Sequence, residues 1–140
     1  MIDYEKLQKA LKHLELQFAN YQHTQERPEL TEIDREAIAE SVIQRFETGY
    51  DSLWKDLKRY LIEELGLADV PNSPKPILKL AGENDLLPAS VGRWLADADA
   101  RTRTAHDYSG EKAAETLLIV GDFIQDAICL YQTMTGKSWP

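Results

Sequence analysis

The residue types best suited to chemistry lie close together in residues 101–108, Arg-Thr-Arg-Thr-Ala-His-Asp-Tyr. Arginine presents a permanently charged fork that suits a phosphate group, and histidine titrates near neutral pH and can transfer a proton. Arg101 and His106 could therefore act together on a phosphate group. From spacing alone, however, a loop of solvated polar side chains is the favoured interpretation of this stretch.

These side chains can act together only if the chain leaves the helical conformation between them. Residues five apart on a continuous helix, such as Arg101 and His106, point about 140° away from each other. The β-branched threonines between them, and Ser109 as a cap for a following helix, favour such a break. In an extended turn, His106 and Tyr108 project to the same side of the chain.

The elements that must position this stretch are helical. Apolar residues recur every three or four positions along most of the chain, and no segment alternates convincingly with a period of two. The sequence therefore predicts an all-α fold, an antiparallel up-and-down bundle of three long and two short helices. We expect these helices at about residues 4–21, 32–65, 74–81, 89–101 and 109–135.

The second of these helices, residues 32–65, has clear start and stop signals. Thr31 and Asp34 can form a capping pair at its beginning, and Gly66 suits the position after its end. Its length of roughly 50 Å is typical of a bundle spine, or of a helix that extends into a partner. Gly49 in its interior costs about 1 kcal/mol relative to alanine, so we expect a close helix contact or a slight bend there.

The last helix, from Ser109 to about Thr135, has an unusually wide apolar stripe. The extra apolar surface fits a homodimer interface, which would include residues 101–108, and deep burial within one compact bundle explains it equally well. The stripe comprises Ala113, Leu117, Val120, Ile124, Ile128 and Tyr131 on one face, with Ile119, Phe123, Ala127 and Leu130 beside it.

Length and composition place limits on the function. A chain of 140 residues fits a single domain, residues 1–140, and 43% hydrophobic residues suffice for a packed core. Sixteen basic residues against 24 acidic ones give a net charge of −8. That is the wrong sign for a protein that coats nucleic acid with its whole surface, so any polyanion must meet a local basic patch.

Several kinds of site and location find no support in the sequence. Cys129 is the single cysteine, so an intrachain disulfide is excluded. His13, His23 and His106 lie far apart, and neither an HExxH nor a CxxC motif nor a glycine-rich phosphate loop occurs. We therefore expect no metal and no cofactor. No apolar run approaches the ~20 residues that span a bilayer, and no secretion signal is evident, so we expect a cytoplasmic protein without membrane contact.

A series of short motifs, in a fixed order along the chain, resembles a known family. The motifs are QRFE at 44–47, YDSLWK at 50–55, SPK at 73–75, then Leu86 and Trp94, and Arg-x4-His-x-Tyr at 101–108. Each is weak alone, but the ordered set covers nearly the whole chain. It is similar to the nucleotidyltransferase substrate-binding proteins, which are helical bundles of the HEPN superfamily.

The resemblance implies a toxin that forms a two-component toxin–antitoxin pair with a minimal nucleotidyltransferase encoded alongside. It implies metal-independent RNA cleavage in a cleft at a homodimer interface, with Arg101 and His106 as the catalytic residues. Tyr108 matches the tyrosine that the partner adenylylates (AMPylation), which silences the toxin. Thr102 and Arg103 are added as supporting phosphate or RNA contacts. Family members commonly have asparagine where this chain has Thr102, whose hydroxyl offers no amide donor pair.

Three functions therefore compete. In the first, His106 takes or gives the proton on the RNA 2′-hydroxyl or the leaving 5′-oxygen. Arg101 then stabilises the charge on phosphorus, and a 2′,3′-cyclic phosphate end results. In the second, the protein is a non-catalytic subunit that presents a substrate, or itself, to a nucleotidyltransferase. In the third, it is a dimeric helical scaffold without chemistry.

Overall fold

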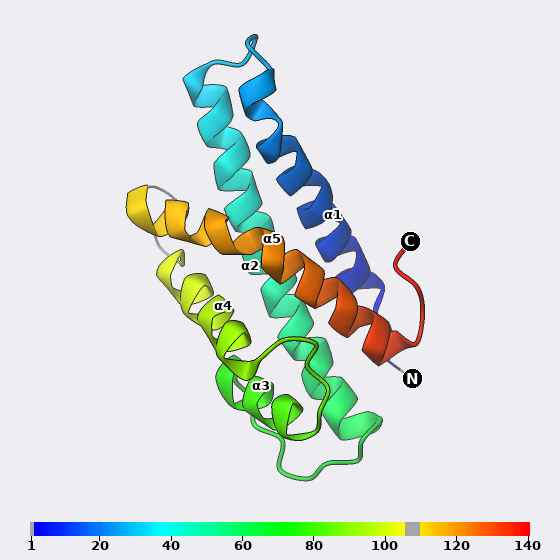
Figure 1. Ribbon diagram of the computed structural model, residues 1–140. Coiled ribbons are helices and arrows are strands. Elements are labelled where there is room, and N and C mark those ends of the chain that lie inside the picture. Colours follow the sequence, from blue (N-terminus) through cyan, green and yellow to red (C-terminus); the bar gives the residue numbers. More distant parts are fainter. Residues whose placement is uncertain (1, 106–109) are drawn as a thin grey trace.

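The computed structural model describes residues 2–105 and 110–140 and confirms the all-helical prediction (Figure 1). The described residues form three long and two short α-helices and no strand. None of these helices combines the length and apolar character needed to cross a membrane. The elements are α1 (Glu5–Gln22), a short 3-10 helix η1 (Thr24–Glu26), α2 (Glu32–Glu63), α3 (Pro74–Glu83), α4 (Val91–Arg103) and α5 (Gly110–Thr135).

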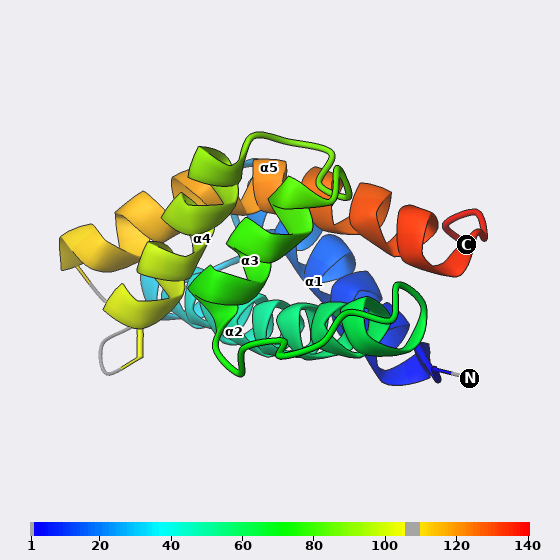
Figure 2. The same ribbon diagram turned by 90° about the horizontal axis from the view of Figure 1, so that it is seen from below.

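The antiparallel pair of α1 and α2 forms the base of the fold. α5 lies obliquely across this pair, and α3 and α4 pack beside it against α2 and α5 (Figure 1). Figure 2 shows that α3, α4 and α5 all lie on one side of the pair. At the end that carries the turn between α1 and α2, the pair extends well past α5 (Figure 1).

Helix α2 begins and ends close to the predicted positions. The Thr31 hydroxyl accepts a hydrogen bond from the backbone of Asp34 at 3.1 Å, and the Asp34 carboxylate accepts one from the backbone of Thr31 at 2.9 Å. The predicted capping pair is therefore confirmed. Gly66 follows the helix with φ +64°, a conformation that favours glycine. A Cβ at Gly49 would lie 3.5 Å from Leu11, which confirms the predicted close contact with α1.

An aromatic cluster joins three helices at the centre of the core. The rings of Phe123 on α5 and Phe46 on α2 pack in a T-shaped arrangement at a centroid distance of 5.0 Å. The ring of Phe123 also lies 6.2 Å from Tyr50 and 6.3 Å from Trp94. All four side chains are buried, and large apolar rings supply much of the free energy of core packing. This cluster fixes α4 against α2, and thereby sets the position of the residues at the end of α4.

Burial within one chain accounts for most of the wide stripe on α5. Its residues Val120, Phe123 and Leu130 are fully buried, and Ile128 is partly buried against the same core. Leu118 is the large apolar side chain of α5 that stands out, since it is 83% exposed. The homodimer stays a prediction.

Helix α4 lies about two residues further along the chain than predicted at both of its ends. It begins after Ser90, whose hydroxyl accepts a hydrogen bond from the backbone of Arg93 at 3.3 Å and so caps the first turn. It ends at Arg103 rather than near Arg101. As a result, Arg101 is a helical residue with a fixed direction instead of a loop residue.

The start of α1 differs from its prediction by one residue. Tyr4 occupies the position before the first helical residue, Glu5. Asp3 accepts a hydrogen bond from the backbone of Glu5 at 2.9 Å. Its carboxylate therefore satisfies one free amide of the first turn.

Candidate functional site

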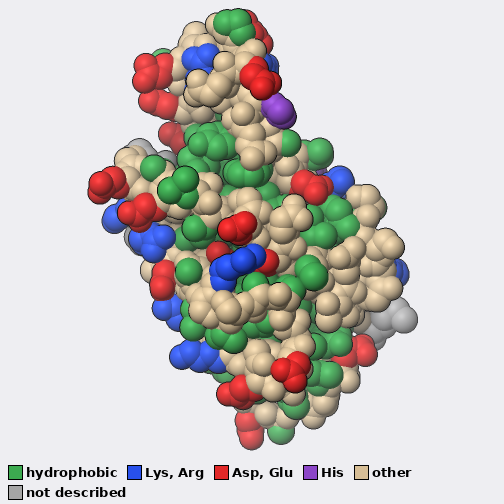
Figure 3. Space-filling view, in the orientation of Figure 1, with side chains coloured by type: hydrophobic (Ala, Val, Ile, Leu, Met, Phe, Trp, Pro, Cys, Tyr) green, Lys and Arg blue, Asp and Glu red, His purple; other side chains and the backbone are tan. Residues whose placement is uncertain are grey.

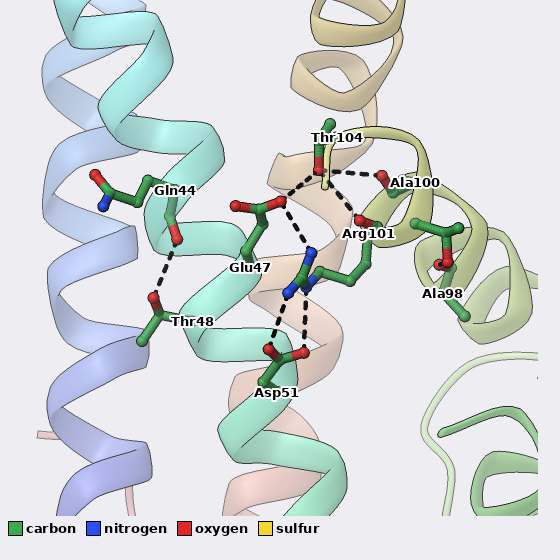
Figure 4. Close-up of polar contacts among 9 residues, drawn as sticks. Gln44, Glu47, Thr48, Asp51, Ala98, Ala100, Arg101 and Thr104 are labelled. Carbon is green, nitrogen blue, oxygen red and sulfur yellow. Dashed lines mark hydrogen bonds and ion pairs between the residues drawn. The ribbon is translucent and has the colours of Figure 1, made fainter. Parts of the chain in front are cut away.

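Arg101 lies in the last turn of α4 and reaches across to α2 (Figure 4). Its Nε and Nη2 donate to the two carboxylate oxygens of Asp51 at 3.2 and 3.1 Å, which makes a bidentate pair. Its Nη1 donates to Oε2 of Glu47 at 3.0 Å. Two carboxylates on successive turns of α2 therefore hold one guanidinium.

Glu47 also holds the residue that ends α4. The hydroxyl of Thr104 donates to the same Oε2 atom at 2.9 Å, and Thr104 is completely buried (Figure 4). The carboxylate of Glu47 lies where water scarcely reaches, since only 8% of the residue is exposed. One oxygen atom thus ties both Arg101 and Thr104 to α2, so the chain leaves α4 from a fixed point.

The spacing on α2 explains why these acids converge on Arg101. Glu47 and Asp51 are four residues apart, so their side chains lie on the same edge of the helix. That edge borders the buried face that carries Phe46 and Tyr50. Because α4 packs on this face, its last turn passes directly over the two carboxylates (Figure 4). We call Arg101, Glu47, Asp51 and Thr104 the anchor cluster.

The charge of Arg101 is already compensated. Its side chain is 28% exposed, that of Asp51 37% and that of Glu47 10%, so water reaches the cluster from the Asp51 side. A phosphate that approaches Arg101 must compete with Asp51 for the same donors. Two carboxylates against one guanidinium leave no net positive charge in the anchor cluster, so an anion needs further cations nearby.

Thr102 and Arg103, the predicted supporting contacts, have partners different from those of Arg101. The hydroxyl of Thr102 donates to the backbone oxygen of Ala98 at 3.2 Å, within its own helix. Arg103 reaches toward α5, where its Nε lies 3.6 Å from Oε2 of Glu115. Figure 3 shows Lys and Arg side chains along this edge, formed by α4 and the start of α5. The structure therefore does not gather Arg101, Thr102 and Arg103 around one ligand.

His106 and Tyr108 lie outside the residues that the structure describes. The helix break that their cooperation with Arg101 requires is present, because α4 ends at Arg103 and α5 begins at Gly110. The predicted roles of His106 and Tyr108 stay predictions.

A second polar cluster, with an exposed arginine above buried acidic side chains, lies at the other end of α4, against α5 and α2. Arg93 makes a bidentate ion pair with Asp126, in which Nε donates to Oδ2 at 2.9 Å and Nη2 donates to Oδ1. Next to this pair, three polar atoms find no hydrogen-bond partner among the described residues. They are Oδ2 of Asp97, Nε1 of Trp94 and the hydroxyl of Tyr50. We call Tyr50, Arg93, Trp94, Asp97 and Asp126 together the lower cluster.

Asp97 is the most perturbed carboxyl of the lower cluster. Burial and the charge of Asp126 raise its pKa to about 7, with Asp122 adding to the increase and Arg93 opposing it. Burial and the charge of Asp97 raise the pKa of Tyr50 as well. Asp97 is only 3% exposed, so no bulk solvent stabilises its charge. Its carboxyl is therefore half protonated near neutral pH.

No group of metal-ligating side chains comes together in the described part of the chain. Within residues 2–105 and 110–140, no three His, Cys, Asp or Glu side chains form a group that could hold a metal ion. His13 and His23 are exposed, as ordinary surface histidines are. Cys129 is exposed on α5.

Comparison with known proteins gives the chain a family. The sequence model of the family described as "Nucleotidyltransferase substrate binding protein like" matches residues 2–136. The chain belongs to this family. The resemblance inferred from the ordered motifs is therefore confirmed, whereas no curated protein matches the chain.

Two solved structures resemble this member of the substrate-binding family over nearly their whole length. HI0074 from Haemophilus influenzae, described as revealing the fold of a substrate binding domain of a nucleotidyltransferase, has a TM-score of 0.83 at 25% identity. The match covers 94% of this chain and 98% of HI0074. The protein ttk003001694 from Thermus thermophilus has a TM-score of 0.67 at 25% identity, over 87% of this chain and 98% of its own.

Sequence reasoning missed the roles of Glu47 and Asp51 in this substrate-binding family member. Both residues belong to the quoted motifs QRFE and YDSLWK, but they were treated only as marks of resemblance. A signal was available, because Glu47 follows the core residue Phe46 and Asp51 follows the core residue Tyr50. Acidic side chains at such boundary positions often meet a cation on the neighbouring helix.

Proposed function

We propose that this chain is the substrate-binding subunit of a two-component nucleotidyltransferase, and that it presents Tyr108 or a bound substrate to a separate catalytic chain. The family match over residues 2–136 supports the partner class. The similarity to HI0074, described as a nucleotidyltransferase substrate binding domain, points the same way. Within the chain, the observation that carries the proposal is the anchoring of Arg101 by two carboxylates.

An arginine held in this way suits positioning better than catalysis. Three of its donors already form hydrogen bonds with Glu47 and Asp51, so the guanidinium connects α4 to α2. The same Glu47 oxygen holds Thr104, and Tyr108 follows Thr104 by four residues. In this proposal the anchor cluster defines where the segment that carries Tyr108 begins, and the partner enzyme supplies the chemistry.

Adenylyl transfer to Tyr108 provides the direct test. The purified chain is incubated with the nucleotidyltransferase encoded alongside it and with ATP and Mg²⁺, and the products are analysed by intact mass and peptide mass spectrometry. We expect the addition of an adenylyl group on Tyr108 and none in Tyr108→Phe. Tyr21→Phe serves as the matched control and should be labelled like the wild type. Label on a residue other than Tyr108 would remove the assignment.

The anchor cluster predicts a kinetic signature as well. Arg101→Gln should slow labelling of Tyr108 while the affinity for the partner stays within about twofold, because positioning affects a reaction geometry more than a docking surface. Arg101→Lys, which keeps the charge but not the fork, should restore only part of the rate. Equal rates in all three proteins would contradict a positioning role.

Metal-independent cleavage of RNA is the second candidate function, and the partial exposure of Arg101 favours it. A phosphate can approach the guanidinium from the side of Asp51. The RNA 2′-oxygen would attack phosphorus as its proton passes to His106, and the 5′-oxygen would leave with a proton from a histidine, with a 2′,3′-cyclic phosphate as product. The toxin role, the homodimer cleft and silencing at Tyr108 belong to this candidate.

Incubation of the isolated chain with RNA in EDTA separates the two candidates. Cleavage that is lost in both His106→Ala and Arg101→Gln, with circular dichroism unchanged, would establish the ribonuclease. His13→Ala is the matched control and should not affect cleavage. Intact RNA, together with partner-dependent labelling of Tyr108, is the result that we expect if the chain is a substrate-binding subunit only.

A further inference from the structure

The surface of α1 and α2 that faces away from α5 contains a shallow groove. Two hollows of about 240 Å³ each lie along it and meet at Thr48, which lines both. The first is bordered by Lys6 of α1 and by Lys55 and Arg59 of α2, and the second by His13 and Arg45. No helix in the described residues covers this side of the pair (Figure 2). We call the two hollows together the α1–α2 groove.

The helical repeat explains why basic side chains collect in the groove. Arg45, Thr48, Lys55 and Arg59 recur at multiples of three and four residues, opposite the face of α2 that buries Phe46. Lys6 and His13 have the corresponding positions on α1. The solvent-facing side of the α1–α2 pair is thus polar, as expected. Its long charged side chains that line the groove are Lys6, Arg45, Lys55 and Arg59, which are all basic.

Charge in the groove departs from that of the whole chain. The net charge of the chain is −8, yet the groove has four permanent cations against three carboxylates. Two of these carboxylates are already paired, Asp51 with Arg101 and Asp56 with Arg59 at 2.9 Å. Lys6, Arg45 and Lys55, by contrast, are exposed and form no ion pair with any carboxylate in the described part of the chain.

The size and polarity of the groove fit a strand of nucleotides. Arg45 and Arg59 are 14 positions apart, which corresponds to about 21 Å along the helix and to several nucleotides of an extended strand. Between them lie the hydroxyls of Thr48 and Ser52. The hydroxyl of Thr48 already donates to the backbone oxygen of Gln44 at 3.1 Å, whereas that of Ser52 can donate to a phosphate or sugar oxygen.

We propose that the α1–α2 groove binds single-stranded nucleic acid through its phosphates, with Lys6, Arg45 and Lys55 as the contacts. Asp51 borders both the groove and the anchor cluster, so a strand in the groove passes beside Arg101. The inference goes beyond the proposed function, because it requires neither the partner enzyme nor Tyr108.

Fluorescence anisotropy with the isolated full-length chain tests the proposal. The probes are oligouridylate and oligodeoxythymidylate of about 12 nucleotides, which is within the range of known single-strand sites. The test variant is the double substitution Lys6→Glu/Lys55→Glu. Its matched control, Lys79→Glu/Lys112→Glu, changes the net charge equally at exposed lysines of α3 and α5. The double substitution Lys6→Gln/Lys55→Gln provides a milder version of the test variant.

We expect the groove variant to weaken binding about tenfold or more and the control by less than about threefold. The slope of log affinity against log salt should fall by roughly 1.4 in the groove variant, since each lost phosphate contact removes about 0.7. Binding of both probes, or of the RNA alone through its 2′-hydroxyl, supports the proposal.

Three outcomes would overturn it. They are no saturable binding at low salt, equal losses in the groove and control variants, or groove variants that bind the probes normally but lose the nucleotidyltransferase partner. The last result would make the groove a protein-docking surface. Because the probes are bound without partner or ATP, failure here leaves labelling of Tyr108 unaffected, and failure of labelling leaves this test unaffected.

Discussion

Both ends of α4 contact carboxyl groups of neighbouring helices, but they compensate the charge of those groups differently. At the C-terminal end, the anchor cluster matches Arg101 with Glu47 and Asp51, and Thr104 adds a further donor. In the lower cluster, Arg93 and Asp126 satisfy one another and leave Asp97 beside them without a cation of its own. Both clusters join α4 to its neighbours, but only the first compensates each buried carboxylate.

This difference indicates what each end contributes. A buried carboxylate with cation and hydroxyl partners specifies one arrangement, at a modest net gain in stability. A buried carboxyl without them is most stable when protonated, so its energetic effect depends on pH. We therefore expect the end of α4 near residues 106–109 to be fixed at all physiological pH values, and the Asp97 end to lose stability as pH rises.

Removing the cation of the anchor cluster is expected to have the largest destabilising effect. Arg101→Met removes the guanidinium that donates to the buried carboxylate of Glu47, which should lower the free energy of unfolding by about 3 kcal/mol. Urea unfolding measures this value. The double variant Arg101→Met/Glu47→Met should recover most of the loss, because the buried carboxylate is then removed together with its cation. A double variant as unstable as Arg101→Met alone would show that the two residues do not interact energetically.

Asp97→Asn should stabilise the protein strongly at pH 8 and much less at pH 5. The pKa of Asp97 is raised to about 7 in the folded chain, and the unfolded value is ordinary, so the folded state binds the extra proton between about pH 4 and 7. Its favourable contribution is complete below the unfolded pKa and is lost as pH rises through 7. The gain at pH 8 is on the order of 4 kcal/mol, since each pKa unit corresponds to about 1.4 kcal/mol.

Urea unfolding at both pH values tests the sign. The control is Asp99→Asn, since Asp99 is exposed, pairs with Lys75 at 2.6 Å and has a lowered pKa. It should show no gain at pH 8. A gain of equal size for Asp97→Asn at pH 5 would mean that its charge is not the cause.

Substitution of the charged neighbours of Asp97, Asp126 and Arg93, should have smaller effects, and the two should shift the pKa of Asp97 in opposite directions. Asp126→Asn removes a negative charge, so the pKa of Asp97 should fall and the pH-dependent loss of stability should begin at lower pH. Arg93→Gln removes a positive charge and should raise that pKa. Carboxyl carbon NMR shifts followed against pH measure both changes. Shifts in the same direction would mean that structural rearrangement outweighs charge in the lower cluster.

The sequence predicted the fold well because the fold depends on periodic burial. Residues that recur at helical spacing, such as Phe46, Tyr50 and Leu53 on α2, are buried, as the spacing of apolar residues along the chain predicts. Thr31 with Asp34 located the start of α2 because capping is a local interaction. The start and end of α4 were less predictable, since a hydroxyl can cap from more than one position near a helix end.

The site was predicted less completely, because it depends on contacts between distant residues. Arg101 was recognised from its type and from its neighbours at 102–108. Its partners Glu47 and Asp51 lie 54 and 50 positions earlier, and no local pattern links them to it. The unpartnered atoms of Tyr50 and Asp97 likewise follow only from the packing of α4 on α2 and α5.

The free end of the α1–α2 pair has a consequence for how the molecule opens. No residue of α2 before Val42 is buried, and the last fully buried residue of α1 is Leu14. Beyond Phe18, whose ring lies against Gly121 of α5, the far turns of both helices rest on each other without the covering helix that protects the middle of the pair. Amide hydrogens at residues 32–41 should exchange with solvent orders of magnitude faster than those near Leu53, through fraying that leaves the rest of the molecule folded.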